Sequence, residues 1–323
     1  MVTPVICSQS SDFRLPVLND VCYSGCMKAT KSTIIVFFLA IVLILVGVVA
    51  YSPASFSALQ MVSLSTVLTA LLSFALSLLT NDYSWTDRLW STLPVAYAWM
   101  YAYASSFTAA ALVAALLITV WGARLTFNFA RRGGYTGEED YRWSILRQRI
   151  GNPLAWIVFN LLFIASYQQF LFIAFTSPLS LLTHPASSVF TPISFVAIVL
   201  FFLCLSIETL ADQQQYTFQQ AKHHLLERDN RYSEDYERGF RTSGLFRRSR
   251  HPNYFGELGV WWSMYLFCAS FHTSLLHFTL AGPLLLTLLF IGSTVFTESI
   301  TASKYPEYAK YQKRVPAILF RFW

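Results

Sequence analysis

The sequence has little charge for its length. Asp, Glu, Lys and Arg make up only 12% of its 323 residues, while 55% are hydrophobic and 17% aromatic. A soluble domain carries roughly 25% charged residues. Four long blocks, residues 32–81, 89–123, 150–207 and 258–297, contain no formal charge at all. These absences argue against a soluble globular protein and predict an all-α, polytopic bundle of transmembrane helices.

Other absences reduce the number of possible functions. The five cysteines include one loose Cys22-x3-Cys26 pair with no matching histidine, so we predict no metal site. No basic stripe lies outside the segments that flank the apolar blocks, so we expect no nucleic-acid partner. Residues 1–31 lack the apolar core of a secretory signal, and we expect a loosely ordered cytosolic tail there.

The charge-free blocks predict the topology. A membrane span needs about 20 residues, so each block can hold a helical hairpin, although residues 89–123 would require short or tilted helices. Seven to eight spans result, with every charged cluster on one side of the membrane. The positive-inside rule makes that side cytosolic, together with both termini. We divide the chain into the tail at 1–31, N-terminal transmembrane helices at 32–123 and a C-terminal domain at 124–323.

The most informative stretch runs from residue 244 to 257, Gly-Leu-Phe-Arg-Arg-Ser-Arg-His-Pro-Asn-Tyr-Phe-Gly-Glu. Its three arginines offer guanidinium groups that match phosphate oxygens in geometry. Pro252 suits the first turn of a helix, which places Asn253 and Glu257 on one face. This composition predicts a site for a polyanionic cofactor at the membrane boundary. The alternative is a cytosolic anchor beside lipid headgroups.

Further polar residues stand at the ends of apolar runs. Glu208 and Asp212 share a helical face with Gln215 and Gln219, at the hydrocarbon edge where a carboxylate is costly. We expect them either to contact a ligand or to brace the bundle by pairing with an arginine. Arg124 follows another apolar run and either snorkels to the interface or contacts an anion. The aromatic residues of the segment 81–90 predict an interfacial belt, with ligand contact as the alternative.

These residues resemble a known superfamily. The string from Gly244 to Glu257, followed by Glu298 and a tail from Lys304 to Pro316, is similar to the C-terminal half of the steroid 5α-reductases and sterol reductases. Isoprenylcysteine carboxyl methyltransferases share a related Arg-His-Pro-x-Tyr pattern. Trp-Gly-x-Arg at 121–124 and Glu-Asp-x-Arg-Trp at 139–143 resemble the 5α-reductase-like membrane branch, and the resemblance spans about residues 82–320.

The resemblance implies an NADPH pocket that opens to the cytosol in the C-terminal half. It implies that Asp212 contacts the cofactor and that Asn253 and Glu257 lie near nicotinamide and ribose. It places Arg124, Arg250 and His251 at the phosphates, with Tyr308 and Arg314 closing the tail over the adenosine end. The expected cofactor-binding residues are Arg124, Glu208, Asp212, Arg250, His251, Asn253, Tyr254, Glu257, Glu298, Tyr308 and Arg314; no catalytic residue is assigned.

The implied reaction is hydride transfer to a C=C bond conjugated to a carbonyl. Steroid 5α-reductases hold the steroid ketone with a tyrosine, where this chain has Trp121, and with an early glutamate, whereas the block 32–81 has no acid. We therefore expect a lipid or sterol-like enone as substrate, in the endoplasmic reticulum or another internal membrane. An S-adenosylmethionine-dependent methyltransferase and a non-catalytic membrane lipid-binding protein are the alternatives.

Overall fold

The computed structural model describes residues 30–53, 55–224 and 226–321, and within these ranges the chain is helical with no strand. The predicted N-terminal tail lies almost entirely outside the described residues. The α-helices are α1 (Lys31–Tyr51), α2 (Ala58–Thr80), α3 (Leu93–Ala104), α4 (Ala109–Ala130), α5 (Tyr141–Ile150), α6 (Pro153–Phe159), α7 (Gln168–Thr176), α8 (Pro192–Lys222), α9 (Ser233–Arg238), α10 (Pro252–Ala269), α11 (Ala281–Lys304) and α12 (Tyr308–Arg314).

Six helical segments are long and apolar enough to cross a membrane. They are α1, α2, α4, the continuous segment Pro153–Thr183 that contains α6 and α7, α8, and the segment Phe278–Lys304 that contains α11. Two further helices, α3 with 12 residues and α10 with 18, correspond to the other spans of the eight-span prediction. The polytopic helical bundle is confirmed, while the number of spans and their orientation stay predictions.

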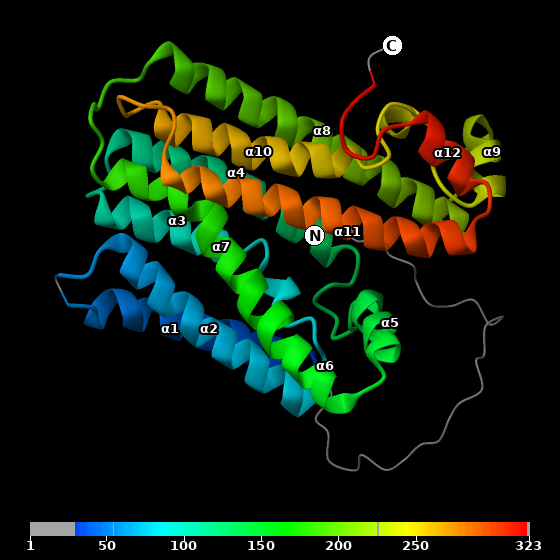
Figure 1. Cartoon of the computed structure of the whole chain (residues 1–323), viewed down its shortest axis with the longest axis horizontal. Helices are drawn as coiled ribbons and strands as arrows, with labels where there is room; N and C mark the ends of the chain where they lie inside the picture. Colours follow the sequence, from blue (N-terminus) through cyan, green and yellow to red (C-terminus); the bar gives the residue numbers. More distant parts are fainter. Residues whose placement is uncertain (1–29, 54, 225, 322–323) are drawn as a thin grey trace.

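The loops without formal charge gather at one end of the bundle, on the left in Figure 1, and the charged segments gather at the other end. At the uncharged end, the amides of Ala186 and Ser187 both donate to the carbonyl of Phe271, which joins two of these loops. At the charged end, α9 and α12 lie side by side at the upper right, and α5 lies below α11 on the same side (Figure 1). Charge therefore divides the molecule in the way that the topology prediction requires.

Small residues allow the helices to approach closely. A Cβ atom added to Gly256 of α10 would lie 2.6 Å from the Cβ of Glu208 on α8, and one added to Gly259 would lie 2.3 Å from the sulfur of Cys204. Gly282 of α11 packs directly against the backbone of α7. A Cβ atom added to Gly282 would lie 1.9 Å from the carbonyl oxygen of Ala174. Close approach through small residues is a common way to pack helices in a bilayer, where water expulsion contributes little between helices.

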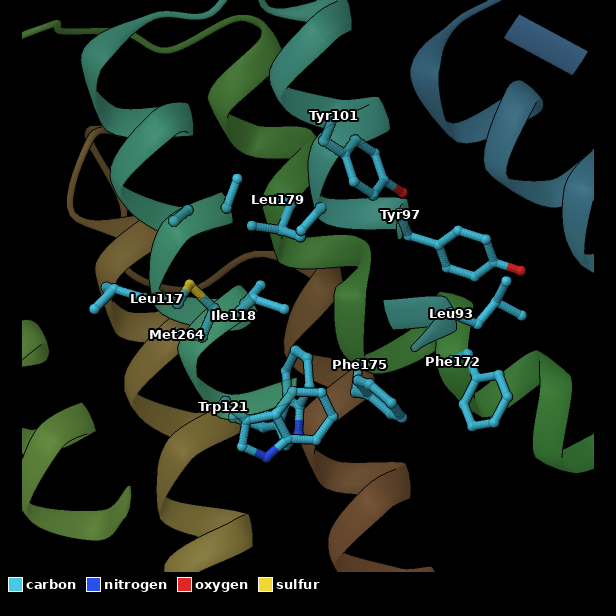
Figure 2. Close-up of a cluster of buried hydrophobic side chains, with 14 of the residues drawn as sticks. Leu93, Tyr97, Tyr101, Leu117, Ile118, Trp121, Phe172, Phe175, Leu179 and Met264 are labelled. Carbon is cyan, nitrogen blue, oxygen red and sulfur yellow. The ribbon is translucent and has the colours of Figure 1, made fainter. Parts of the chain in front are cut away.

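A single apolar core joins both halves of the chain. Figure 2 shows side chains of α3, α4, α7 and α10 in one cluster, in which Trp121 lies against Trp261 at 4.9 Å and Phe175 against Trp261 at 4.3 Å between ring centroids. The division expected between residues 123 and 124 falls inside α4.

Residues 82–90 are buried and only Asn81 of this segment is exposed, so the predicted interfacial belt is wrong. Trp85 and Trp90 are 1% and 3% exposed, and Arg88 is fully buried with its Nη2 donating to Asp82 at 2.7 Å. The aromatic rings pack against the helices because the loop folds inward beneath the segment that joins α4 and α5. Arg88 donates to the carbonyl oxygens of Gly134 and Glu138 in that segment.

Candidate functional site

The residues before α10 pair with the end of the chain. The amides of Arg250 and His251 donate to the carbonyl oxygens of Pro316 and Ala317 at 3.0 and 2.9 Å. The amide of Arg321 donates back to the Arg248 carbonyl at 2.8 Å. As predicted, α10 begins at Pro252. The Arg-His-Pro string therefore fixes both the start of α10 and the course of the tail.

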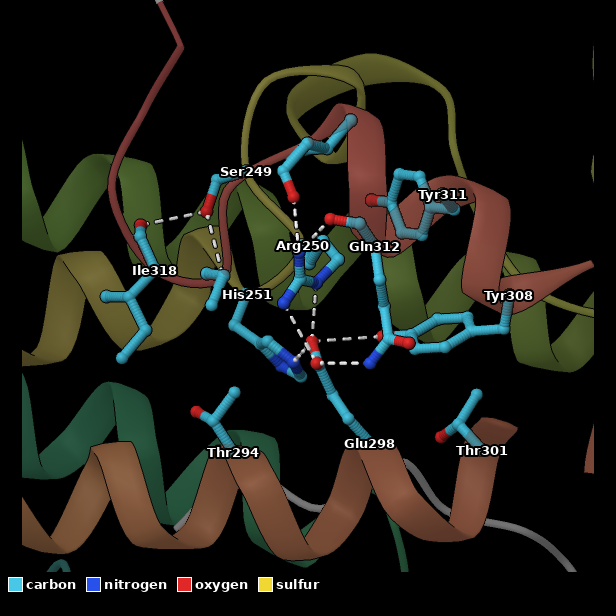
Figure 3. A network of polar contacts seen from close by, with 12 residues as sticks. Ser249, Arg250, His251, Thr294, Glu298, Thr301, Tyr308, Tyr311, Gln312 and Ile318 are labelled. Carbon is cyan, nitrogen blue, oxygen red and sulfur yellow. Dashed lines mark hydrogen bonds and ion pairs between the residues drawn. The ribbon is translucent and has the colours of Figure 1, made fainter. Parts of the chain in front are cut away.

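Glu298 of α11 is the acceptor that holds this region together (Figure 3). Arg250 donates to it through Nε at 2.6 Å and Nη2 at 2.9 Å, and Arg250 Nη1 donates to tail carbonyls. Three more side chains converge on the same carboxylate: His251 at 2.9 Å, Tyr308 at 3.2 Å and Gln312 at 2.8 Å. Arg250 and Glu298 thus fasten α12 onto α10 and α11.

A cavity of about 370 Å³ lies beside this junction, between α8, α10, α11, α12 and the loop before η5 (Gly244–Arg247). Its lining includes five of the predicted site residues: Arg250, His251, Asn253, Tyr254 and Tyr308. Carboxamides, aromatic rings and cationic side chains from segments far apart in the sequence complete it. The cationic residues are Arg132, Lys222, Arg241, Arg250 and Lys304, and within the described part of the chain no Asp or Glu lines the cavity.

Three of these cations have no carboxylate partner among the described residues: Lys222, Arg241 and Lys304. Lys222 Nζ donates to the Gly239 carbonyl at 2.6 Å and to the Tyr305 hydroxyl at 2.7 Å, and Arg241 donates to the Gln214 carbonyl at 2.7 Å. Burial lowers the pKa of His223 in the lining, and the charges of Lys222 and Lys304 lower it further. The cavity is therefore positively charged and suited to an anion.

A second polar cluster, which we call the buried ion cluster, consists of Arg124, Glu208, Asp212 and Glu257. Arg124 on α4 donates to Glu208 and, at 2.7 Å, to Asp212, both on α8. Glu257 on α10 accepts from Trp121 at 2.9 Å and Trp261 at 3.0 Å. Its carboxylate lies 3.9 Å from the Arg124 guanidinium. The three carboxylates are at most 2% exposed, so each depends on these partners in place of water.

Asp212 connects the buried ion cluster to the cavity. It accepts from Asn128 at 2.7 Å and from Asn253 at 3.4 Å, and it lies 3.6 Å from the Arg132 guanidinium. Asn253 and Arg132 also line the cavity. Of the two roles left open for Asp212, pairing with arginines across the bundle is the one that this geometry displays.

Arg314 does not reach the cavity. It is exposed and lines a neighbouring groove of about 600 Å³ together with Arg247 and Lys310. Phe240 and Tyr311 line both spaces and so separate them. The structure brings Tyr308 to the cavity and leaves Arg314 on its outer side.

Comparison with known proteins places this arrangement in a family. Residues 73–315 match the model of a family described as a protein of unknown function (DUF1295). The chain belongs to this family. It is also 37% identical over 256 residues to "Uncharacterized protein C594.04c" of Schizosaccharomyces pombe, covering 75% of this chain and 74% of that one. No solved structure matches the chain.

The DUF1295 match includes every residue that lines the cavity. The sequence analysis did not predict four cationic residues of the cavity lining: Arg132, Lys222, Arg241 and Lys304. A signal existed for one of them, because Lys222 continues the α8 face of Glu208, Asp212, Gln215 and Gln219 at helical spacing. Arg241 comes from an irregular loop, and no local pattern marks it.

Proposed function

We propose that this DUF1295 protein is an NADPH-dependent reductase of the steroid 5α-reductase superfamily. Its substrate would be a lipid or sterol-like enone in an internal membrane, such as the endoplasmic reticulum. One observation carries the proposal: a cavity at the charged end of the bundle presents Lys222, Arg241 and Lys304 without carboxylate partners among the described residues. Unneutralised cations in a concave site favour a polyanionic ligand.

The donor set fits a nicotinamide dinucleotide. Ammonium and guanidinium groups suit its phosphates, and the rings of Phe240 and Tyr305 in the lining offer flat faces to its bases. Gln215 and Asn253 add carboxamides that can donate and accept hydrogen bonds. When bound, NADPH supplies the hydride. The protein's part is to hold the anion and to keep Asn253 in place through Asp212, from which its carboxamide is 3.4 Å away.

The same charge argument disfavours S-adenosylmethionine. That cofactor carries a sulfonium and an ammonium against one carboxylate and is cationic overall. A cavity with unpaired cations and no acidic lining within the described chain would repel it. The methyltransferase alternative therefore receives less support from this site than the reductase.

A thermal-stability experiment in detergent tests the proposal. NADPH should raise the melting temperature of the wild-type protein, whereas Lys222→Ala should weaken binding by about 1.5–3 kcal/mol, the usual worth of a hydrogen bond to a charged group. Lys310→Ala is the matched control, because Lys310 lies on the outer groove and its ammonium is 4.0 Å from Glu307. Oxidation of NADPH on adding an enone lipid, followed by absorbance, then reports turnover.

Two results would overturn the proposal. Stabilisation by S-adenosylmethionine instead of NADPH would identify the methyltransferase. Stabilisation by neither, in a protein that melts cooperatively, would favour a non-catalytic lipid-binding role.

A further inference from the structure

The three arginines between residues 247 and 250 have different surroundings. The guanidinium of Arg250 is bound by Glu298, whereas Arg247 and Arg248 are exposed. Within the described chain, the side chains of Arg247 and Arg248 make no ion pair or hydrogen bond. Arg247 lines the outer groove of about 600 Å³, and Arg248 does not. The charge of Arg247 is therefore free to bind a ligand in that groove.

The outer groove lies between α9, η5 and α12, and α9 and α12 lie side by side at the charged end (Figure 1). Three of its lining residues, Phe240, Tyr311 and Val315, are apolar or aromatic and at most 9% exposed. The charged lining residues are Arg238, Arg247, Lys310 and Arg314 against Glu234 and Glu307. Four cations against two carboxylates give the groove an excess of positive charge.

The two carboxylates account for two of the cations. Arg238 donates to Glu234, and the ammonium of Lys310 lies 4.0 Å from Glu307. These contacts leave the other two cations of the groove without a carboxylate.

The unneutralised pair is Arg247 and Arg314. Like Arg247, Arg314 has no side-chain ion pair or hydrogen bond with another described residue. Arg247 is the last residue of η5 and Arg314 the last of α12, so two separate segments bring free guanidinium groups to one groove. Guanidinium forks bind phosphate oxygens through paired hydrogen bonds.

The end of the chain presents an apolar side chain beside these cations. Arg321 donates through its amide to the carbonyl of Arg248 at 2.8 Å and through Nη1 to the carbonyl of Arg314 at 2.7 Å. Leu319, two residues before Arg321, is 69% exposed. An exposed leucine among cations at the charged end of a membrane bundle is typical of a segment that lies in the headgroup region.

We propose that the outer groove binds the phosphorylated sugar-alcohol headgroup of an anionic phospholipid. Arg247 and Arg314 hold the phosphate monoester, and the acyl chains lie on the side of Leu319. The carboxylate of Glu307 accepts hydrogen bonds from hydroxyl groups, which a bare phosphate ion does not offer in the same number.

The size of the groove agrees with this class of headgroup. Its volume of about 600 Å³ equals that of about 20 water molecules at ~30 Å³ each, which is more than a single phosphate fills. Phe240 and Tyr311 separate it from the cavity that we assign to NADPH, so the two ligands can bind independently.

The test measures the melting temperature of detergent-solubilised protein, without nucleotide, against the concentration of three probes. Dioctanoyl phosphatidylinositol 4-phosphate has both the headgroup and the chains. Dioctanoyl phosphatidylinositol lacks the phosphate monoester, and inositol 1,4-bisphosphate lacks the chains. The first probe should raise the melting temperature by at least about 2 °C and act at about tenfold lower concentration than either of the others.

Two pairs of neighbouring residues provide matched variants. Arg247→Gln and Arg314→Gln should each weaken binding of the phosphorylated lipid about tenfold. Arg248→Gln and Lys313→Gln remove the same charge from exposed neighbours outside the groove, so they should weaken binding less than about threefold.

Three results would overturn the proposal. Equal stabilisation by the two lipids, or equal losses in the groove variants and their neighbours, would indicate a general attraction of cations to anionic lipid. Inositol 1,4-bisphosphate acting as strongly as the phosphorylated lipid would identify a soluble ligand. If NADPH stabilises the wild-type protein, it should also stabilise Arg247→Gln and Arg314→Gln, and loss of that effect would assign the groove to the nucleotide. Failure of NADPH to stabilise the wild type would leave the lipid result unaffected.

Discussion

Asp212→Ala tests whether the buried ion cluster braces the bundle. The substitution removes the acceptor of Arg124 and Asn128, both at 2.7 Å, and the carboxylate 3.6 Å from Arg132. Stranding one partner of a buried ion pair costs about 3–5 kcal/mol. Because Arg124 keeps Glu208 as a partner, we expect the lower end of that range. At about 2–4 °C per kcal/mol, the melting temperature should fall by roughly 6–12 °C without any nucleotide.

The assay is thermal unfolding in detergent, with and without NADPH. Gln219→Ala is the matched control on the same face of α8, because Gln219 lines the cavity and its side chain makes no hydrogen bond to another side chain among the described residues. It should melt within about 1 °C of wild type, as surface substitutions usually do. A nucleotide-free melting temperature for Asp212→Ala within about 1 °C of wild type would refute the bracing role and return Asp212 to ligand contact.

Three further predictions concern other parts of the molecule. Gly256→Ala should lower the free energy of unfolding by about 1–3 kcal/mol, because the added Cβ would meet α8. Gly292 has open space around it, so Gly292→Ala should leave the free energy of unfolding unchanged or raise it. Denaturation of the two variants in detergent measures both effects. Arg250→Ala should release the C-terminal segment, so limited proteolysis should cut there faster than in wild type. Burial raises the pKa of Glu139 to about 7, with Arg147 opposing and Asp82 and Asp140 adding to the shift. The folded state therefore binds this proton more tightly than the unfolded state, so stability should fall as pH rises from about 4.5 to 7, and Glu139→Gln should flatten that decline; an equal slope in both proteins would contradict it.

The sequence by itself determined the class of the fold and part of the site. Charge-free blocks predict apolar helices, because the hydrocarbon of a bilayer offers the backbone no hydrogen-bond partners. Each N–H and C=O group must then be paired within its own helix. The proline at 252 fixes the start of α10 by its missing N–H, and the 3.6-residue period places Glu208 and Asp212 on one face. These properties are local, so one sequence suffices to state them.

Tertiary structure decided which partner each polar group has. Arg250 is read from the sequence as a phosphate ligand, but its guanidinium is taken by Glu298, 48 residues away, and by the tail. Arg124 finds Glu208 at a separation of 84 residues, and Arg241 reaches the cavity from a loop. Pairing of this kind depends on how α4, α8 and α10 cross, and that is set by the close approach at residues such as Gly256. A charged side chain has the same local sequence whether it meets a carboxylate, a carbonyl or a ligand, so only the folded bundle distinguishes the three.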